Sequence, residues 1–517
     1  MSSRSAWSVM AGWGAGAKVV TTLPERQEAW LRSCMSRNSD CAYGQLHGFD
    51  KVTSAADFRD RVPISDYDQL SPSIERVASG ERNVLFAGSP VAFEETGGSC
   101  GGRKLIPYTA ESLDDFRRSL LPWLGRAVRT HGIASGTAYW AISPATRAPA
   151  VTPGGIRIGL SDASYLGPKA GDALMAVSAV PASVAELTDV ETWRLATLYW
   201  LVRARDLALV SIWSPTYFLM LLDSLRKSAS ELLPVLTAGA AIGGVTVPRD
   251  IPAAKRLERY LAGTDASVLW PDLRLVSCWS DGASRSWSAR LSERLALPVF
   301  EPKGLLSTEA VVTVPDATGQ PRLAADSGFF EFMDGQGAVH LPGELRTGHL
   351  YEVLITTSGG LYRYRTHDLV ECGPPGEQGP IINFVGRDDL HSDLVGEKLT
   401  EAFVARCLKA VPGCRLLVPE VDPTPRYVLL VEGGERRELP DPSSVEARLL
   451  ENPQYAYARR FGQLAHVTVR GVSGLMNRYL SHAVAGGARL GDIKMAALRA
   501  ELKWLPILEG NAPCGSC

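Results

Sequence analysis

The sequence lacks three features that would each point to a class of protein. It has no excess of one charge, because 54 Lys plus Arg stand against 56 Asp plus Glu, so nothing indicates nucleic acid or an anionic membrane surface as a partner. It has no apolar run of about 18 residues, the length that a membrane-spanning helix needs. Its N-terminal stretch is broken by Ser and Gly and does not read as a signal peptide, so we expect a cytosolic protein without a membrane partner.

Cysteine and histidine also form no recognisable site. The nine cysteines are an odd number and are scattered along the chain, which argues against a disulfide framework. Cys514 and Cys517 have the spacing of a redox pair, but two ordinary thiols are the favoured interpretation. The eight histidines show no ligand-like spacing, so a zinc site is not expected.

At 517 residues the chain is long enough for two or three domains. Between residues 190 and 300 helical patterns alternate with short apolar strands, which predicts a mostly parallel sheet flanked by helices. Ligands of such sheets collect at the carboxyl ends of the strands. The predicted helices span 191–204, 215–225 and 284–295, and the predicted strands span 207–213, 273–278 and 298–300.

The C-terminal part has a different character. Residues 351–357 and 361–372 read as an antiparallel pair, and 381–385 as a further strand. After them the pattern is that of a compact α+β unit. We therefore predict a large N-terminal domain over 1–385, a hinge at 386–389, and a smaller mobile domain over 390–517.

A glycine-rich stretch, ETGGSCGGRK, lies at 95–104 between two apolar runs. Glycines accept the backbone angles that let several N–H groups converge on an anion such as phosphate. The stretch fits neither the Walker spacing, because Arg103 precedes Lys104 and Leu105 follows it, nor the dinucleotide spacing. Its flanks, 91–94 and 105–108, read as strands, which favours a hairpin flap over a triphosphate. An ordinary turn is the alternative.

Five motifs occur in the order found in adenylate-forming enzymes: ETGGSCGGRK, GLLSTEA, YRYRTHDLVE, FVGRDDL and GDIK. More closely, the chain resembles the bacterial branch of the auxin-responsive acyl-acid amido synthetase family, whose plant members join amino acids to jasmonate, auxin or benzoates. The resemblance runs from about Val62 to Leu498. It implies an α/β fold whose large domain combines mostly parallel sheets with a β-barrel-like part, and it implies ATP and Mg²⁺ as cofactors.

The resemblance also implies a nucleotide site. The glycine-rich loop would hold the phosphates, small residues after a strand would lie against adenine, and a carboxylate and an arginine would meet the ribose. The residues implied are Thr96, Gly98, Ser99, Gly101 and Gly102 for the phosphates, Gly282 and Ala283 for adenine, Ser307 and Thr308 near the α-phosphate, and Asp368 and Arg387 at the ribose. Two of them have competing interpretations: Asp368 would pair with Arg363 or Arg365, and Arg387 with Asp388 or Asp389.

Two further residues would carry the chemistry together with Thr308. Glu309 matches the Mg²⁺ ligand of the family, a hard oxygen donor that joins metal and phosphates. Lys494, in the GDIK motif, matches the lysine that reaches the α-phosphate and the carboxylate in the family. Their competing interpretations are a solvated surface glutamate and a solvated lysine. The chain also departs from the family, because Gly97 and Cys100 stand where a hydroxyl is usual.

The expected activity is that of an ATP-dependent ligase. It would adenylate a small carboxylic acid and pass the acyl group to an amine, with an amino acid as the expected acceptor. One alternative keeps the adenylation and transfers to a thiol, coenzyme A or a carrier protein. Another is a nucleotide-binding protein without catalysis, which the missing hydroxyls at Gly97 and Cys100 favour. Neither the acid, the amine nor the oligomeric state follows from the sequence.

Overall fold

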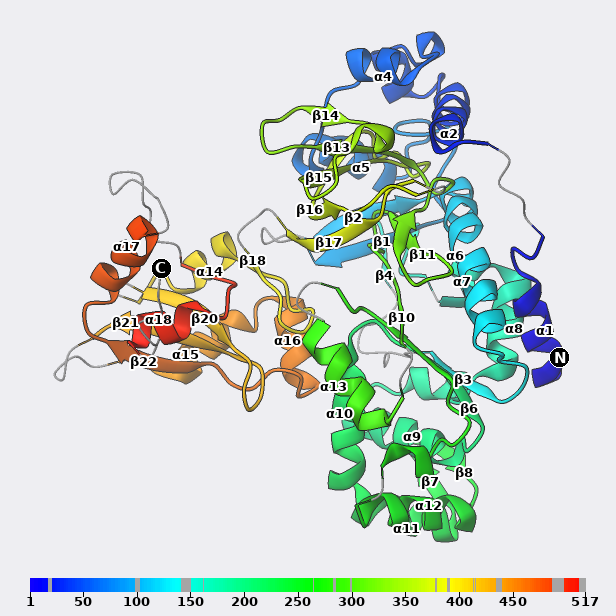
Figure 1. Cartoon of the computed structure of the whole chain (residues 1–517), viewed down its shortest axis with the longest axis vertical. Helices are drawn as coiled ribbons and strands as arrows, with labels where there is room; N and C mark the ends of the chain where they lie inside the picture. Colours follow the sequence, from blue (N-terminus) through cyan, green and yellow to red (C-terminus); the bar gives the residue numbers. More distant parts are fainter. Residues whose placement is uncertain are drawn as a thin grey trace. The chain divides into compact units, whose positions relative to one another are not determined.

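The computed structural model describes the chain except for 17–20, 98–102, 141–149, 161, 264, 282–284, 298–299, 377–378, 388–390, 412, 414, 434–438, 486–496 and 511–517. The chain folds into two compact units. Unit 1 holds residues 1–96 and 104–388, and unit 2 holds residues 97–103 and 389–517. Figure 1 labels most of their elements, which are numbered in chain order.

Capping residues set the starts of several N-terminal helices of unit 1. The side chains of Thr22, Ser54 and Asp66 each accept a hydrogen bond from the backbone N–H three residues further on. The side chain at that later position accepts in turn from the backbone N–H of the capping residue. These capping boxes satisfy N–H donors that have no partner within the helix. The helices of this region are α1 (Ser3–Gly12), α2 (Leu23–Arg37), α3 (Ala42–His47), α4 (Ala55–Arg61) and α5 (Tyr67–Ala78).

A four-stranded parallel sheet forms the centre of the helix-rich part of unit 1. Its strands lie in the order β10 (Phe300–Pro302), β9 (Leu275–Cys278), β6 (Leu207–Ser211) and β3 (Thr137–Trp140). Every residue of β6 and β9 is buried, as expected of strands with helices on both faces. One face packs on α1, α6 (Ala110–Thr130) and α8 (Pro168–Val177). On the other, Phe218 of α10 (Pro215–Lys227) contacts Tyr139.

Other elements surround this sheet. They are α9 (Val190–Arg203), α11 (Ala229–Ala238), the pair β7 (Ala240–Ile242) and β8 (Val245–Val247), α12 (Ile251–Leu261) and α13 (Arg285–Leu295). A second sheet has the order β2 (Arg103–Tyr108), β1 (Ala92–Gly97), β5 (Arg157–Ile158) and β4 (Ala150–Val151). Helix α7 (Asp162–Leu166) follows it.

The third sheet of unit 1 is antiparallel and has five strands. Their order is β14 (Val339–His340), β13 (Phe329–Met333), β15 (Leu350–Thr356), β16 (Tyr364–Cys372) and β17 (Ile382–Arg387). A separate antiparallel pair, β11 (Thr313–Pro315) and β12 (Pro321–Leu323), precedes these strands in the chain. Its apolar residues share one core with α5, β1, β2 and the start of α6. The second and third sheets are therefore packed together, with α6 leading away toward the parallel sheet.

Unit 2 is a three-stranded sheet with helices on both faces. Successive residues of β20 (Arg415–Glu420) and β21 (Arg426–Glu432) alternate between two cores, as side chains of a strand alternate between its faces. β22 (Thr468–Val472) completes the sheet, parallel to β21. One core includes residues of α14 (Glu401–Cys407), α15 (Pro442–Leu449) and α16 (Pro453–Arg460), and the other includes residues of α17 (Leu475–Ala485) and α18 (Trp504–Glu509).

The predicted α/β fold class, with a mostly parallel sheet and a smaller C-terminal α+β part, is confirmed. One local expectation was wrong. The strand predicted to end at residue 385 continues to Arg387 in pairing with β16, so Gly386 and Arg387 are strand residues. The domain boundaries and a hinge function stay predictions, and residues 388–390 lie outside the described part.

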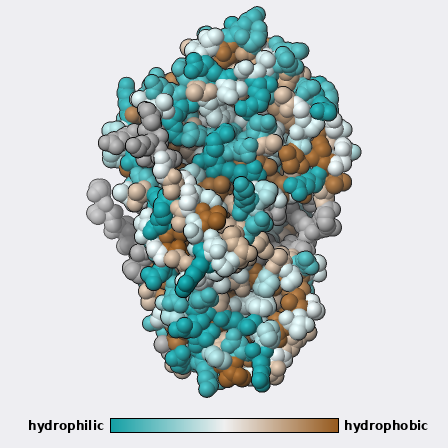
Figure 2. Space-filling model, turned by 90° about the vertical axis from the view of Figure 1, so that its right-hand side faces the viewer, coloured by the Kyte–Doolittle hydropathy of each residue, from teal (hydrophilic) through white to brown (hydrophobic). Residues whose placement is uncertain are grey.

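The face of the molecule in Figure 2 carries hydrophobic residues in scattered patches among hydrophilic ones. Among the described residues, no helix is both long enough and apolar enough to cross a bilayer.

Candidate active site

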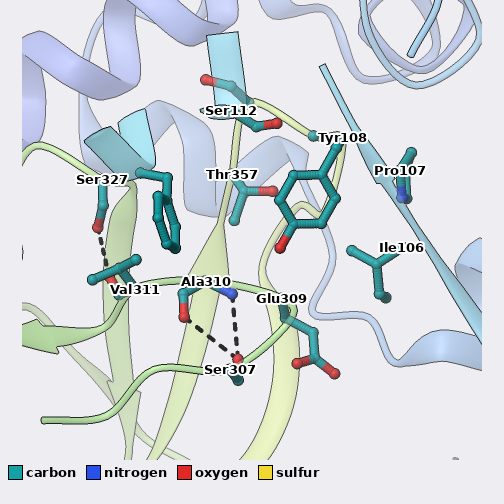
Figure 3. A pocket seen from close by; sticks show the side chains of 13 residues that line it. Ile106, Pro107, Tyr108, Ser112, Ser307, Glu309, Ala310, Val311, Ser327 and Thr357 are labelled. Atoms are coloured by element: carbon teal, nitrogen blue, oxygen red, sulfur yellow. Dashed lines mark hydrogen bonds between the residues drawn. The ribbon is translucent and has the colours of Figure 1, made fainter. Parts of the chain in front are cut away.

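The STE motif forms the tip of a tight turn. Ser307 N donates to Ala310 O at 3.0 Å, and the Ser307 hydroxyl accepts from Ala310 N at 3.3 Å, so Thr308 and Glu309 are left at the tip. Figure 3 shows Glu309 beside Ser307 and Ala310. The turn starts at Gly304, whose φ is +72° and where a Cβ would lie 2.4 Å from Thr313 O. Only glycine fits there without displacing the backbone.

A tyrosine from the glycine-loop sheet holds this tip. Tyr108, the last residue of β2, donates its hydroxyl to Thr308 O at 2.5 Å, and Figure 3 shows the ring turned toward the turn. Burial raises the pKa of this hydroxyl above its ordinary value, so it stays protonated and can donate at neutral pH. The ring of Tyr165 in α7 meets Tyr108 edge-on at 5.4 Å between centroids.

The turn and Tyr108 border a small pocket. Its volume of about 30 Å³ has room for one or two water molecules, so it is too small to hold a whole substrate. It brings together the end of β2, the start of α6, the STE turn and the loop after β15. The lining residues are Ile106, Pro107, Tyr108, Ser112, Phe116, Ser307, Glu309, Ala310, Val311, Ser327, Thr357, Ser358 and Gly359.

Hydrogen bonds fix the loop after β15 against the start of α6. Thr109, the N-cap of α6, donates its hydroxyl to Ser358 O at 3.2 Å. Ser358 donates its own hydroxyl to Asp115 Oδ2 of α6 at 2.6 Å. A Cβ at Gly359 would lie 2.6 Å from Pro107 O. These contacts place the pocket wall at a fixed distance from α6 and leave no room for a larger residue at Gly359.

Asp368 and Arg387 are neighbours on adjacent strands. They are directly opposite each other in the pairing of β16 with β17, and Asp368 is buried. The arginines proposed as its competing partners bind other carboxylates: Arg363 binds Glu331 through Nε at 2.9 Å, and Arg365 binds Glu352 through Nη2 at 2.6 Å. Ribose binding by Asp368 stays a prediction.

The structure thus describes some of the predicted site residues and not others. Ser307, Thr308 and Glu309 belong to one turn, and Ser307 and Glu309 line the pocket. Thr96 lies in β1. The other predicted residues, Gly98, Ser99, Gly101, Gly102, Gly282, Ala283 and Lys494, lie outside the described residues.

The donor set at this turn suits a magnesium ion that arrives with nucleotide. In the described part of the chain, no three His, Cys, Asp or Glu side chains gather as metal ligands. Glu309 offers one carboxylate beside the pocket. Mg²⁺ at phosphate-transfer sites is usually held by one or two carboxylates together with substrate phosphates and water. One carboxylate at Glu309 is compatible with that arrangement, and Mg²⁺ binding by Glu309 stays a prediction.

Sequence reasoning did not identify Tyr108, Asp115 or Ser358 as site residues. Tyr108 ends the predicted strand 105–108, and this position gives no sign of a functional role. Its partner Thr308 is 200 positions away. Contacts of that separation have no local pattern, so only the folded chain reveals them.

Comparisons with known proteins agree with this architecture. Residues 17–296 match the GH3 family N-terminal domain, and residues 322–387 match the GH3 family central domain. The putative indole-3-acetic acid-amido synthetase GH3.10 of Oryza sativa subsp. japonica is 23% identical over 403 residues, covering 74% of this chain and 82% of the relative. The indole-3-acetic acid-amido synthetase GH3.3 of Arabidopsis thaliana is 23% identical over 437 residues, covering 76% and 72%.

Two solved structures share the fold. The AtGH3.15 acyl acid amido synthetase in complex with 2,4-DB has a TM-score of 0.66 at 18% identity, and the match covers 98% of this chain and 96% of that one. The 2-hydroxyisobutyryl-CoA ligase in its thioesterification state has a TM-score of 0.54 at 14% identity, covering 92% and 90%. Because the N-terminal family domain alone spans more than half of the 517 residues, the chain belongs to the GH3 family.

Proposed function

We propose that this protein is an ATP-dependent acyl-acid amido synthetase. It adenylates a small carboxylic acid and transfers the acyl group to an amine, with an amino acid as the expected acceptor. The observation that carries the proposal is the STE turn of a GH3 family chain, which presents Glu309 beside a pocket and is held by Tyr108. The curated relatives of the chain are named amido synthetases.

The reaction has two balanced steps. A carboxylate oxygen of the acid attacks the α-phosphorus of ATP, a P–O bond breaks, and pyrophosphate leaves. The amine nitrogen then attacks the acyl carbon, a C–N bond forms, AMP leaves, and the nitrogen loses a proton. The first step brings two anions together, so the site must neutralise charge and align the reactants.

The residues of the turn are suited to the first step. Tyr108 keeps the Thr308 carbonyl and the Glu309 backbone in place before substrate arrives, through a bond of 2.5 Å. A preorganised group of this kind needs no rearrangement during the reaction. Glu309 would hold Mg²⁺, which supplies charge neutralisation for the phosphates when it is bound.

Other assignments remain part of the proposal. Lys494 would act on the α-phosphate and the carboxylate, Asp368 and Arg387 would bind ribose, and Thr96 with the glycine-rich loop would bind the phosphates. We also keep a hinge at 386–389, membership of the bacterial branch and a cytosolic location as proposals. Each residue assignment can be tested by a single substitution.

The decisive experiment is a pyrophosphate-release screen over carboxylic acids with ATP and Mg²⁺. Product formed with a mixture of amino acids is then identified by mass. We expect acid-dependent release by the wild type and its loss in Glu309→Gln and Lys494→Ala. The matched control is Glu258→Gln, which changes an exposed glutamate of α12 in the same way and should behave as wild type.

Three outcomes would contradict the proposal in different ways. Retained release in both Glu309→Gln and Lys494→Ala would reject the assigned site. Consumption of the acyl-adenylate by coenzyme A but not by amino acids would move the activity to thiol transfer. Release at background level for every acid would indicate a nucleotide-binding protein without catalysis.

A further inference from the structure

Strand β16 carries a bulge that ends at Asp368. One residue of β15, Val353, faces the three residues 366–368 of β16, because the register of the two strands shifts there. Strands β15, β16 and β17 lie side by side in Figure 1. A bulge bends its strand and changes the direction in which a side chain points, and bulges are frequent next to active sites. This bulge therefore sets the direction of the carboxylate that is proposed for the ribose.

His367 is the middle residue of the bulge and has an unfavourable backbone conformation. Its φ is +61°, in the left-handed region that residues with a Cβ rarely adopt. A residue stays in such a conformation only where its surroundings hold it there, and residues of this kind are frequent at functional sites. Contacts of the His367 side chain must therefore help to keep the backbone left-handed.

The imidazole of His367 makes one such contact. Its Nδ1 lies 3.2 Å from Glu352 Oε1 on β15, and a carboxylate only accepts hydrogen bonds, so Nδ1 is the donor. Glu352 is itself fixed, because Arg365 donates to both of its oxygens, at 3.0 and 2.6 Å. Burial opposes the ionisation of Glu352, but the bonds from His367 and Arg365 outweigh it and lower the pKa to about 2. The acceptor is therefore charged at neutral pH.

The two neighbours of His367 are also held. Thr366 donates its hydroxyl to Val353 O at 3.0 Å and accepts from Asp368 N at 3.1 Å. Asp368 is buried and lies directly opposite Arg387 in the pairing of β16 with β17. The bulge is thus bound to β15 through Thr366 and the His367 ring, and to β17 through Asp368.

We propose that His367 is a positioning residue, whose bond to Glu352 keeps the bulge in the conformation that directs the Asp368 carboxylate to the ribose hydroxyls. The inference rests on the proposed function and adds a residue to its nucleotide site. Asp368 directly follows His367, so a return of His367 to the ordinary β region would turn the next peptide and move the carboxylate. Hydrogen bonds weaken steeply as their angle departs from linear, so a moved carboxylate binds the ribose less well.

The test compares ATP with 2′,3′-dideoxy-ATP, which lacks both ribose hydroxyls. Calorimetry measures the binding of each nucleotide to the full-length protein with Mg²⁺ and without acid, so that no turnover occurs. We expect wild type to prefer ATP, and His367→Ala to lose about tenfold of that preference, at the lower end of what a hydrogen bond to a charged group contributes. The affinity for the dideoxy nucleotide should stay the same. Asp368→Ala gives the preference that remains without the carboxylate.

A second arm uses acid-dependent pyrophosphate release. In His367→Ala the kcat/KM for ATP should fall about tenfold relative to that for the dideoxy nucleotide, while the KM for the acid stays the same. A residue that only stabilises the fold would not change the discrimination between two nucleotides that differ in their hydroxyls. The split between nucleotide and acid therefore separates a positioning role from a structural one.

A rescue and a matched control complete the set of variants. His367→Asn should keep most of the ATP preference, because Nδ2 of asparagine is as many bonds from Cα as Nδ1 of histidine and can donate to Glu352, and because asparagine tolerates the left-handed region. His340→Ala breaks another histidine–carboxylate pair of the same sheet, in which Nε2 of His340 lies 2.9 Å from Asp334 Oδ2. This control should behave as wild type.

If His367→Ala does not fold by circular dichroism, His367→Gly replaces it, because glycine accepts a positive φ without strain and also lacks the ring. A wild-type ATP preference in a folded variant without the ring would overturn the inference, as would an equal loss of affinity for both nucleotides. A loss in His367→Asn as large as in His367→Ala would contradict it too. If neither ring-free variant folds while His367→Asn does, His367 is structural and the inference is wrong.

This inference and the proposed function fail separately. Absence of acid-dependent pyrophosphate release in the wild type rejects the amido synthetase function. Normal release by a wild type that binds both nucleotides equally well rejects the ribose role of Asp368 and, with it, the role of His367. Normal release with an ATP preference that survives removal of the ring rejects only the role of His367.

Discussion

Removing one hydroxyl from Tyr108 tests whether the STE turn must be held in place before substrate arrives. Tyr108→Phe deletes the donor of the 2.5 Å bond to Thr308 O and leaves the ring, which is 8% exposed, in its packing. A net hydrogen bond contributes about 0.5–1.5 kcal/mol, and the carbonyl left without its donor adds to the loss. We expect the free energy of unfolding to fall by about 1 kcal/mol.

The loss of activity should be larger than this loss of stability explains, because the deleted bond holds the backbone that carries Glu309. If the tip loses about 1.4 kcal/mol of preorganisation, the kcat/KM for ATP in acid-dependent pyrophosphate release falls about tenfold. A protein that is destabilised by about 1 kcal/mol is still almost wholly folded at 25 °C. Global unfolding therefore cannot account for a tenfold loss.

A matched control separates the effect of losing this bond on the STE turn from the effect of losing stability. Tyr199 of α9 donates its hydroxyl to Pro248 O, also from a buried ring, and lines no part of the pocket. Tyr199→Phe should lower the unfolding midpoint by a similar amount and leave kcat/KM unchanged. Equal activity in Tyr108→Phe and wild type would refute the argument that this bond positions the turn. Equal losses in the two variants would show that the effect is one of stability.

Two further predictions concern stability. Gly304→Ala should lower the free energy of unfolding more than Gly244→Ala. Both positions have positive φ, which costs about 1–2 kcal/mol for other residues, but only at Gly304 would the new Cβ also meet a backbone oxygen, at 2.4 Å. Chemical denaturation of the two variants measures the difference, and equal losses of unfolding free energy would contradict the prediction. Burial raises the pKa of Glu397 in unit 2 from 4.5 to about 7, so its contribution to stability is present below pH 4.5 and is lost as pH rises through 7. Thermal unfolding between pH 4.5 and 8 should therefore show a fall with pH that Glu397→Gln lacks, and an identical slope in the two proteins would contradict the prediction.

Periodicity predicted much of the fold. The alternation of helix and strand between residues 190 and 300 produces the parallel sheet. Such features are local, because they depend on side-chain spacing within one element. The sequence patterns did not predict several other elements, namely the hairpin of β7 and β8 and helices α11, α12, α17 and α18.

The end of β17 shows why a local pattern can mislead. Gly386 and Arg387 precede two aspartates, a composition typical of a turn, yet both are strand residues paired with Leu369 and Asp368. Pairing with an already formed neighbour outweighs a weak local preference. A sequence alone does not show that such a neighbour is available, so the strand end could not be placed.

The sequence likewise predicted some residues of the candidate site and not others. The motif around Ser307, Thr308 and Glu309 could be recognised because its three residues are adjacent, and they do form one turn beside a pocket. Tyr108 was not singled out, since its importance comes from its contact with Thr308, which is distant in the sequence. An isolated tyrosine in a sequence carries no such information.

Helix α6 connects these distant parts physically. Its first turn is tied to the loop after β15 through Thr109 and Asp115. Phe116 lines the pocket at the STE turn, and Trp123 donates to Glu301 of β10. The helix therefore packs against both the STE turn and the parallel sheet. A substitution at Ser358 that loosens the start of α6 should disturb both contacts.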